Sequence, residues 1–248
     1  MNNRHVKLLE LVNASGRIEV ATLSDRLDVS QVTIRKDLVL LEENGLLKRE
    51  HGFAVMISSD DISTRLAFNY DVKRKIAALA AKIVENGETV MIESGSCCAL
   101  LAKELANNKR DVTIITNSAF IASYIRKCPH IKIVLLGGDY QPESQVLVGP
   151  ITRKCIEGFY VDKLFVGTDG FTEKVGFSGK NHLRTETVRA MAENANSVIV
   201  LTESIKFSKQ GVVAQFKTNE VTTIITDNKI PEGVKNILLK NNVDVQIV

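Results

Sequence analysis

The chain has 248 residues, of which 44% are hydrophobic and 25% are charged, and its formal net charge is +3 at pH 7. This length allows one or two domains with a substantial core, and the composition is that of a globular protein rather than a disordered or fibrous one. No apolar run approaches the ~20 residues of a membrane span, and the start M-N-N-R-H lacks the apolar centre of a signal peptide. We therefore expect a cytoplasmic protein without a membrane partner, and the small positive charge only weakly indicates a nucleic-acid partner.

The N-terminal segment predicts one helix followed by a closely spaced helix pair. Apolar residues between Val6 and Val12 predict a first helix that ends at Ser15-Gly16. Val20–Leu27 is a short amphipathic segment, and Asp28-Val29 forms the turn after it. A short helix, a tight turn and a second helix in this order can place the second helix in the major groove of DNA.

The second helix of the pair begins after Ser30, whose hydroxyl is a good N-cap acceptor. Ile34, Leu38 and Leu41 are spaced four and three apart and therefore share one face, and Gly45 suits the left-handed position after the helix. The other side of the first half would then carry the residues that contact bases and backbone. The candidate DNA-binding residues of this helix are Ser30, Gln31, Thr33, Arg35 and Lys36.

Residues 46–57 alternate loosely between polar and apolar types and predict a two-stranded wing. Lys48, Arg49 and His51 would hold this wing to phosphate or in the minor groove. Charge leaves an alternative open, because residues 1–57 contain 8 Lys/Arg and 8 Asp/Glu, whereas a strongly basic domain is typical of nucleic-acid binding. A small helical cap or dimerisation module would fit that balance.

The run from Val29 to Ala54 resembles the DeoR-type winged helix-turn-helix, whose signature is V-S-x-x-T-I-R-R-D-L, then L-E, then G, then R-x-H-G-G-A. The matching residues are Val29-Ser30, Thr33-Ile34-Arg35, Asp37-Leu38, Leu41-Glu42, Gly45, Arg49, His51-Gly52 and Ala54. Lys36 stands for the second Arg and keeps its charge, whereas Phe53 replaces the second Gly. The resemblance implies a sequence-specific transcription factor, expected to be a repressor, that binds a double-stranded DNA operator as a homo-oligomer, a dimer or tetramer.

We expect the DNA-binding domain at residues 1–57, a linker or arm at 58–72 and a second domain at 73–248. From Val72 onward, short apolar runs of strand length alternate with segments of helical spacing. This alternation predicts a doubly wound, mainly parallel α/β sheet that helices cover on both faces. The expected strands are Thr89–Ile92, Val112–Ile115, Ile131–Leu136, Leu164–Val166, Val198–Leu201, Thr223–Ile225 and Val243–Val248, with helices around Ile76–Ile83, Cys98–Leu105, Phe120–Ile125, Thr187–Ala195 and Val234–Leu239.

Polar and glycine residues recur where these strands end. Because the carboxyl ends of parallel strands form the ligand crevice of an open sheet, we expect a small-molecule site there. The Ser94–Ser96 loop leads into a helix N-terminus, where free amides favour an anion such as phosphate, and Lys206 adds a point charge. Tight turns need Gly, Ser and Asn in any case, so a single loop would also fit a purely structural role. The candidate effector-binding residues are Glu93, Ser94, Gly95, Ser96, Cys97, Asn117, Gly137, Gly138, Asp169, Gly170, Glu186 and Lys206.

The second half also resembles the DeoR-type effector domain, which is related in fold to ribose-5-phosphate isomerase and glucosamine-6-phosphate deaminase. The matching runs are Thr116-Asn117-Ser118, Leu136-Gly137-Gly138, Val148-Gly149 and Asp162 to Gly170. The resemblance implies a phosphorylated sugar as the effector. Glu93-Ser94-Gly95-Ser96-Cys97 replaces the family's Asp-Ser-Gly-Thr-Thr, Glu203-Ser204-Ile205-Lys206-Phe207 replaces Asp-Ser-Ser-Lys-Phe, and Arg184 replaces a Glu, with Glu186 two positions on. These departures point to an altered effector or to one bound through fewer contacts.

The four cysteines indicate neither a metal site nor a cofactor. Cys97, Cys98, Cys128 and Cys155 contain no C-x-x-C spacing and no clustered His partner, so we expect no zinc. The adjacent Cys97 and Cys98 could form a redox pair, but two reduced residues are the expectation for a cytosolic protein.

Three functions remain to be separated. The first is the DNA-binding regulator described above. The second is a sugar-phosphate isomerase or deaminase with a helical appendage, in which Glu93, Asp169, Glu186 and Glu203 act as acid or base. We do not expect an enzyme, because the helix-turn-helix would then be unexplained. The third is a DNA-binding protein whose ligand site is vestigial.

Overall fold

The structure is a computed structural model that describes residues 3–43, 46–56 and 60–248. The chain divides into two compact units, unit 1 (Met1–Tyr70) and unit 2 (Asp71–Val248), and each is described here by itself. Gly45, which we expect after the second helix of the pair, lies outside the described residues. None of the helices in the described ranges is long and apolar enough to cross a membrane.

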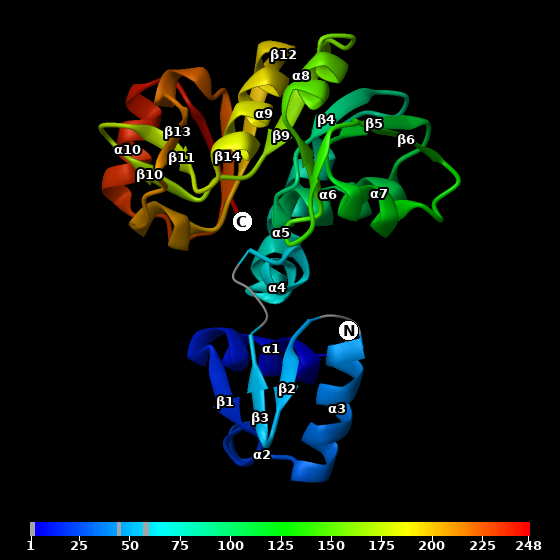
Figure 1. Cartoon of the computed structure of the whole chain (residues 1–248). Coiled ribbons are helices and arrows are strands. Elements are labelled where there is room, and N and C mark those ends of the chain that lie inside the picture. The colour runs from blue at the N-terminus through cyan, green and yellow to red at the C-terminus, as the bar shows by residue number, and fades with distance from the viewer. Residues whose placement is uncertain (1–2, 44–45, 57–59) are drawn as a thin grey trace. The chain divides into compact units, whose positions relative to one another are not determined.

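Unit 1 is a winged helix-turn-helix (Figure 1). Its helices are α1 (Asn3–Ser15), α2 (Val20–Leu27), α3 (Gln31–Glu43) and α4 (Ile62–Ala67). Among its described residues, β1 (Arg17–Glu19), β3 (Phe53–Val55) and β2 (Lys48–Glu50) form an antiparallel sheet in that order. The predicted helix pair and wing are therefore confirmed, and α2 has the predicted bounds.

Two elements of unit 1 were not predicted. Strand β1 is only three residues long, so it has no periodic signal in the sequence. Helix α4 forms inside the segment expected as a linker or arm, because the Asp61 carboxylate caps it by accepting a hydrogen bond from the Thr64 amide at 2.9 Å.

Aliphatic side chains of the three N-terminal helices form the core of unit 1. The largest contributions come from Leu8, Leu9, Val12, Leu23, Ile34, Leu38 and Leu41, all fully or almost fully buried. The predicted inward face of α3 is thus confirmed, and the other side of α3 is left for solvent or for a ligand.

Unit 2 is built on one parallel sheet. Within residues 71–248, all of which the structure describes, seven parallel strands pair in the order β15-β14-β12-β9-β4-β5-β6 (Figure 1). The strands are β4 (Thr89–Ile92), β5 (Val112–Thr116), β6 (Ile131–Leu135), β9 (Val161–Val166), β12 (Ala195–Leu201), β14 (Thr223–Thr226) and β15 (Asp244–Ile247). Each predicted strand is found, and the largest error is three residues at the start of β9 and of β12.

Helices cover both faces of this sheet. They are α5 (Tyr70–Lys82), α6 (Ser96–Asn108), α7 (Ala119–Ile125), α8 (Pro150–Ile156), α9 (His182–Glu193) and α10 (Glu232–Lys240). The chain runs outward from β4 through β5 to β6, then returns to β9 beside β4 and runs the other way to β15. Right-handed crossovers in opposite directions place α6 and α7 on one face and α9 and α10 on the other, as a doubly wound fold requires.

Unit 2 also contains short elements that the sequence did not predict. Strands β10 (Gly170–Thr172), β11 (Gly176–Gly179) and β13 (Val213–Phe216) form a small antiparallel sheet, and β7 (Asp139–Gln141) pairs with β8 (Val146–Val148). The 3-10 helices η1 (Ser204–Ser208) and η2 (Thr218–Glu220) and helix α8 were also not predicted. These strands are short, and polar residues or glycines interrupt most of them, so they lack both a periodic pattern and the apolar run that marks the strands of the parallel sheet.

The strand order fixes where a ligand would bind. Strands β4 and β9 are neighbours, and the direction of strand progression reverses between them. In open parallel sheets, ligands bind outside the carboxyl ends of the strands at such a switch point. The loops after β4 and β9, which begin at Glu93 and Gly167, therefore lie at the position expected of a ligand site.

Candidate functional site

Helix α3 begins at the cap that the sequence predicts. The Ser30 hydroxyl accepts a hydrogen bond from the Thr33 amide at 3.2 Å and lies 2.9 Å from the Thr33 hydroxyl. A satisfied N-cap sets the first turn of the helix. Ser30 and Thr33 thus contact each other, so both of these predicted DNA-binding residues also form the start of the helix.

The outward side of α3 presents polar and cationic side chains. Gln31, Arg35 and Lys36 are exposed, and so is the neighbouring Val32 at 60% of its surface. The Arg35 Nη2 donates to the Gln31 Oε1 at 3.2 Å. A guanidinium and an amide with free hydrogen-bonding capacity are the groups that read G and A in the major groove. The position of these side chains supports DNA recognition by this helix.

The wing is joined to α3 by one of its own predicted DNA contacts. The backbone amide of Arg49 donates to Glu42 Oε1 at 2.8 Å, and Arg49 Nε donates to Glu42 Oε2 at 2.6 Å. Arg49 therefore fixes β2 to the end of α3. Lys48 and His51 are exposed on β2 and the turn after it, where the sequence predicted phosphate contacts.

Phe53, which departs from the family pattern, has a structural role in the wing. The guanidinium carbon of Arg17 lies 3.8 Å from the centroid of the Phe53 ring, a distance typical of a cation–π contact. Arg17 Nε also lies 3.6 Å from Glu50 Oε2. The aromatic ring thus joins β1 to the β2–β3 hairpin where the family has a glycine.

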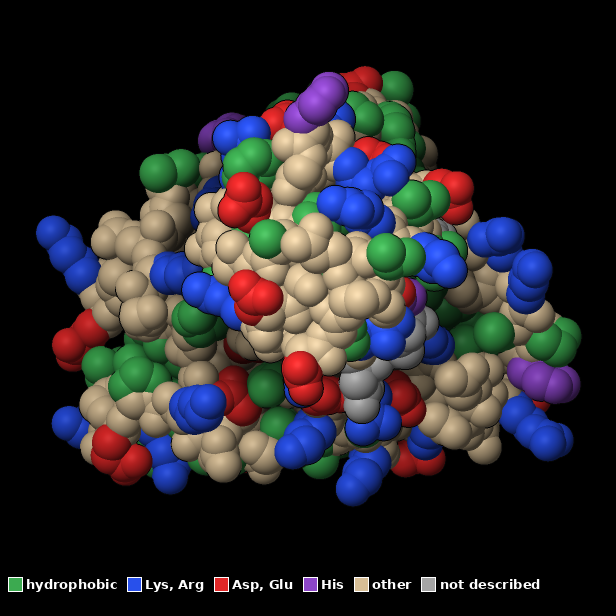
Figure 2. Space-filling model, turned by 90° about the horizontal axis from the view of Figure 1, so that it is seen from below, with side chains coloured by type: hydrophobic (Ala, Val, Ile, Leu, Met, Phe, Trp, Pro, Cys, Tyr) green, Lys and Arg blue, Asp and Glu red, His purple; other side chains and the backbone are tan. Residues whose placement is uncertain are grey.

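Basic and acidic side chains are mixed on the surface of the protein. Figure 2 shows Lys and Arg side chains interspersed with Asp and Glu side chains rather than one continuous basic surface. Residues 1–57 by themselves contain 8 Lys/Arg and 8 Asp/Glu. Any contribution of charge to DNA binding must therefore come from local groups such as Arg35-Lys36 and Lys48.

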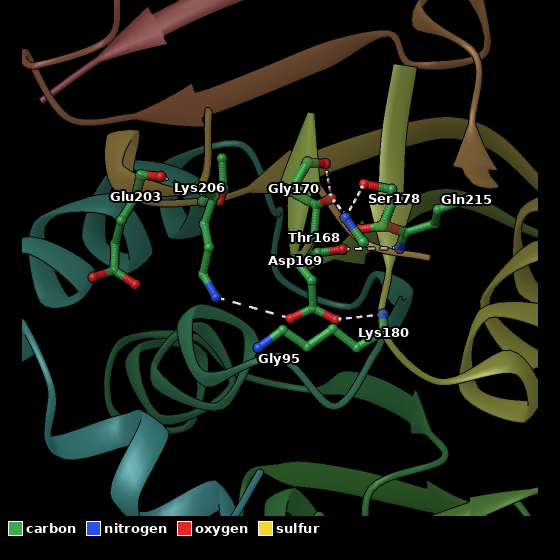
Figure 3. A network of polar contacts seen from close by, with 12 residues as sticks. Gly95, Thr168, Asp169, Gly170, Ser178, Lys180, Glu203, Lys206 and Gln215 are labelled. Carbon is green, nitrogen blue, oxygen red and sulfur yellow. Dashed lines mark hydrogen bonds and ion pairs between the residues drawn. The ribbon is translucent and has the colours of Figure 1, made fainter. Parts of the chain in front are cut away.

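A group of polar residues follows the strands at the switch point of unit 2. We name it the carboxyl-edge cluster, and it comprises Glu93, Ser94, Gly95, Ser96, Cys97, Asp169, Glu203 and Lys206. Figure 3 shows part of it, with the side chains of Lys206 and Asp169 pointing toward each other. The cluster contains both signs of charge and the start of a long helix, α6.

Glu93 is engaged within the protein. Its Oε1 accepts a hydrogen bond from the Ser94 hydroxyl at 2.7 Å, and its Oε2 accepts from the amides of Gly95 at 2.8 Å and Gly167 at 3.2 Å. The loops come so close that a Cβ on Gly95 would lie 3.3 Å from the Gly167 Cα. The carboxylate of Glu93 thus ties the loop after β4 to the loop after β9.

Lys206 and Asp169 remain partly accessible. Their side chains are 24% and 29% exposed, and Lys206 Nζ lies 3.8 Å from Asp169 Oδ1 (Figure 3). Asp169 Oδ2 also accepts from the Lys180 amide at 3.0 Å. Burial lowers the pKa of the Lys206 ammonium, and the Asp169 carboxylate opposes this shift. A cation with few competing contacts at a sheet edge can bind an anionic group.

Cys97 lies in the first turn of α6, and the charged groups near this cluster act on its thiol. Burial, with a smaller contribution from the negative charge of Glu203, raises the pKa of its thiol to about 12, while Lys73 and Lys206 act in the opposite direction. The four cysteines, all among the described residues, are free thiols. Cys97 is therefore a neutral, weak hydrogen-bonding group rather than a nucleophile.

Four other predicted effector residues, namely Asn117, Gly137, Gly138 and Gly170, make contacts within the protein. Asn117 donates to the Leu147 carbonyl at 3.1 Å, and its buried Oδ1 has no partner among the described residues. The Gly137 carbonyl accepts from the Thr152 hydroxyl at 2.7 Å. A Cβ on Gly138 would lie 1.9 Å from that hydroxyl oxygen, and one on Gly170 would lie 2.4 Å from the Lys209 carbonyl. Gly138 and Gly170 therefore allow close packing, whereas Asn117 keeps a free acceptor among the described residues.

Glu186 has a different environment from the rest of the predicted set. It is exposed on α9, and its carboxylate lies 3.6 Å from Nδ1 of His182 on the same helix. The structure therefore places residues 93–97 near Asp169 and Lys206, whereas Glu186 contacts His182 on its own helix.

The sequence reasoning missed Lys73. Its Nζ lies 3.3 Å from Glu203 Oε2, and the two side chains are only 2% and 6% exposed. Glu203 directly precedes η1, which carries Lys206. A usable signal was present in the sequence, because Lys73 is spaced three and four residues from Ile76 and Ala77 on the buried face of α5. A lysine in such a stripe needs a partner charge from elsewhere.

Both units match known families. Residues 4–60 match the family described as DeoR-like helix-turn-helix domain, and residues 68–228 match the one described as DeoR C terminal sensor domain. The chain belongs to the DeoR family. Its relatives include the HTH-type transcriptional regulator GolR of Listeria innocua, 34% identical over 93% of this chain and 92% of GolR.

Two further relatives match this chain over nearly its full length. The glycerol-3-phosphate regulon repressor of Escherichia coli K12 is 27% identical and covers 98% of both chains. The HTH-type transcriptional repressor GlcR of Bacillus subtilis is 29% identical over 98% of this chain and 95% of GlcR. Since the DeoR matches include both units, the protein is a transcriptional regulator with a DNA-binding and a sensor domain, and it is not an enzyme.

Proposed function

We propose that this DeoR-family protein is a repressor of an operon for carbohydrate metabolism and that a phosphorylated sugar modulates its binding to operator DNA. One relative is named a glycerol-3-phosphate regulon repressor, and the proposal transfers its repressor role to this chain and takes a phosphorylated compound, such as the one in that name, as the class of effector. The observation that carries the DNA-binding part is the exposure of Gln31, Arg35 and Lys36 on α3, away from the core face.

The sensor part of the proposal rests on the carboxyl-edge cluster. Lys206 is a partly accessible cation beside the first turn of α6, and the amides of such a turn have no partners within the helix. A phosphate monoester would accept hydrogen bonds from both. Asp169, close to Lys206, would accept a hydroxyl of the sugar.

Regulation requires more than binding at this cluster. The protein would act in the cytoplasm as a homo-oligomer, so that two copies of α3 contact half-sites about 34 Å apart or a multiple of that spacing. The effector must bind the DNA-competent and the DNA-incompetent arrangements unequally, because a ligand without differential affinity shifts no population. Operator DNA and effector would then weaken or strengthen each other by the same factor.

The DNA-binding part is tested by footprinting the full-length protein on the DNA beside its own coding region. Arg35→Ala should weaken operator binding by about 10- to 100-fold, since a base contact of this kind contributes ~1–3 kcal/mol. Lys7→Ala is the matched control, because it also removes one exposed positive charge, from α1. Equal retention of the operator by wild-type and Arg35→Ala protein in a gel shift would refute the assignment of Arg35.

The sensor part is tested by calorimetry against a panel of sugar phosphates. The expected result is binding of at least one compound and a loss of about tenfold or more in affinity in Lys206→Met, because a hydrogen bond to a charged group contributes ~1.5–3 kcal/mol. Lys209→Met, at an exposed lysine after η1, is the control. Equal binding by both variants would exclude Lys206 from the site.

A second candidate function has its own supporting observation. The Glu93 carboxylate already occupies the amides of Gly95 and Gly167 at the switch point, where a ligand phosphate would otherwise find donors. This occupancy favours a DNA-binding protein whose sensor site is vestigial. A panel in which no sugar phosphate binds the wild-type protein, with operator binding intact, would support this candidate over the first.

A further inference from the structure

Helix α3 carries acidic residues although its outward side is proposed to approach the phosphates of DNA. The acids are Asp37, Glu42 and Glu43. Glu42 is joined to Arg49 of the wing, and Glu43 is exposed. Asp37 differs from both because it is only 7% exposed. A carboxylate in such a place must be paired, since burying an isolated charge costs several kcal/mol.

Two residues of α1 pair with Asp37. Arg4 Nε donates to Asp37 Oδ2 at 2.6 Å, and Arg4 Nη2 donates to Oδ1 at 3.0 Å. The Nε2 of His5 lies 3.0 Å from the same Oδ1. We name these three residues the α1–α3 clamp. The hydrogen bonds from Arg4 hold the pKa of the Asp37 carboxyl below its usual range, so the carboxylate is ionised and His5 donates.

The clamp differs in kind from the apolar packing of unit 1. Leu9 of α1 and Leu38 of α3 both belong to the aliphatic core of this unit. Apolar packing is non-directional, whereas a guanidinium that binds both oxygens of a carboxylate fixes distance and angle. The clamp therefore restricts the rotation of α3 about its axis and its position along α1.

Asp37 directly follows the outward residues Arg35 and Lys36 in the sequence. We propose that the α1–α3 clamp positions the side chains of Arg35 and Lys36 for contacts with bases. Asp37 would then determine sequence discrimination without touching DNA. The proposal rests on the proposed function, because it presupposes that α3 reads bases. It makes Asp37 a positioning residue, which acts through Arg35 and Lys36.

Discrimination between operator and other DNA responds differently from non-specific DNA affinity when the side chains of α3 are displaced. Hydrogen bonds to base edges depend on geometry, whereas phosphate contacts tolerate small displacements. Loss of the clamp should therefore lower the ratio of operator affinity to non-specific affinity by about 10- to 100-fold, the effect of misplacing one or two base contacts. The dependence of affinity on salt should stay constant, because no phosphate contact is removed.

The experiment uses the full-length protein and an operator obtained by in vitro selection from random duplexes. Fluorescence anisotropy gives the Kd of Asp37→Asn for the operator and for a scrambled duplex of equal length at several salt concentrations. The expected result is an operator Kd raised about 10- to 100-fold, a scrambled-duplex Kd changed less than about threefold and an unchanged salt slope. Glu43→Gln is the matched control, because it removes one negative charge from an exposed position of the same helix, and its affinity ratio should equal that of the wild type.

A second variant protects the test against unfolding. Arg4→Ala keeps the carboxylate and removes its main partner, and every measurement is made at least about 20 °C below the melting temperature of the variant. If Asp37→Asn does not fold, Arg4→Ala decides the question with the same expected ratio. In the folded variants, the double substitution Arg4→Ala/Asp37→Asn should lose no more discrimination than Asp37→Asn alone, because the two residues act as one device.

Two outcomes overturn the proposal. One is an affinity ratio within twofold of the wild type in whichever clamp variants fold. The other is an equal loss of operator and scrambled-duplex affinity, which would mark the clamp as purely structural. Failure of the proposed function looks different, because the selection would then return no preferred sequence for the wild-type protein itself.

Discussion

Replacing Lys73 by methionine should destabilise unit 2 strongly. The substitution keeps most of the length of the side chain but removes the ammonium that pairs with the Glu203 carboxylate. Both side chains are almost fully buried, at 2% and 6% exposure, and their atoms lie 3.3 Å apart. Removing one partner of a buried ion pair costs about 3–5 kcal/mol, because the remaining charge stays desolvated.

The expected change in melting temperature follows from the size of unit 2. A domain of about 150–250 residues loses ~2–4 °C for each kcal/mol, so Lys73→Met should melt about 6–20 °C below the wild type. Near-UV circular dichroism of tyrosine follows unit 2, because three of the four tyrosines lie in residues 71–248. Urea unfolding monitored in the same way provides an independent free energy of unfolding.

The double variant Lys73→Met/Glu203→Met separates the loss of a partner from the loss of packing. Replacing both charges by apolar side chains of similar volume is often neutral or stabilising, so the double variant should recover most of the lost stability. Lys154→Met is the control, because the Lys154–Glu157 pair lies at the surface, where ion pairs contribute little. A Lys73→Met protein that melts with the Lys154→Met control would refute the reasoning, since the pair would then not be buried.

Three further predictions concern DNA, thiol chemistry and acid. Lys48→Ala should reduce the slope of log affinity against log salt by about one phosphate contact, as measured by anisotropy, and an unchanged slope would remove Lys48 from the interface. Iodoacetamide at pH 8 should modify the half-buried Cys128 before Cys97, whose buried thiol has a pKa of about 12; mass spectrometry of digests would contradict this if Cys97 reacted first. Arg4 lowers the pKa of Asp37, so this residue stabilises unit 1 at neutral pH, and the contribution is lost as the pH falls below ~3.9. Asp37→Asn should therefore show a shallower loss of stability in acid than the wild type.

Several structural elements could not be predicted from the sequence for a physical reason. Strands β7, β10 and β13 have three or four residues and pair with neighbours far along the chain or across a short turn. Such strands are held by tertiary contacts, and their few residues give no alternation to detect. Helix α8 was missed as well, although Pro150 at its first position is a common start signal.

The sequence by itself determined the helix pair and wing, the seven strands of the parallel sheet and the family. The spacing of Ile34, Leu38 and Leu41 decided which side of α3 is buried, and hence that Arg35 and Lys36 face outward. Apolar runs of three to six residues decided the strands of the parallel sheet. These features follow from local periodicity, because the repeat of a helix or a strand alone determines which residues share a face.

Only the tertiary structure decided which groups meet. Asp37 binds Arg4 across 33 positions of sequence, Lys73 is paired with Glu203, and Glu93 occupies the amide of Gly167 as well as that of Gly95. No local pattern contains these pairs, because they depend on helix packing and on the order in which the strands lie in the sheet. A charged residue on a buried face of the sequence pattern indicates that a partner is needed, but only the tertiary structure determines which residue that partner is.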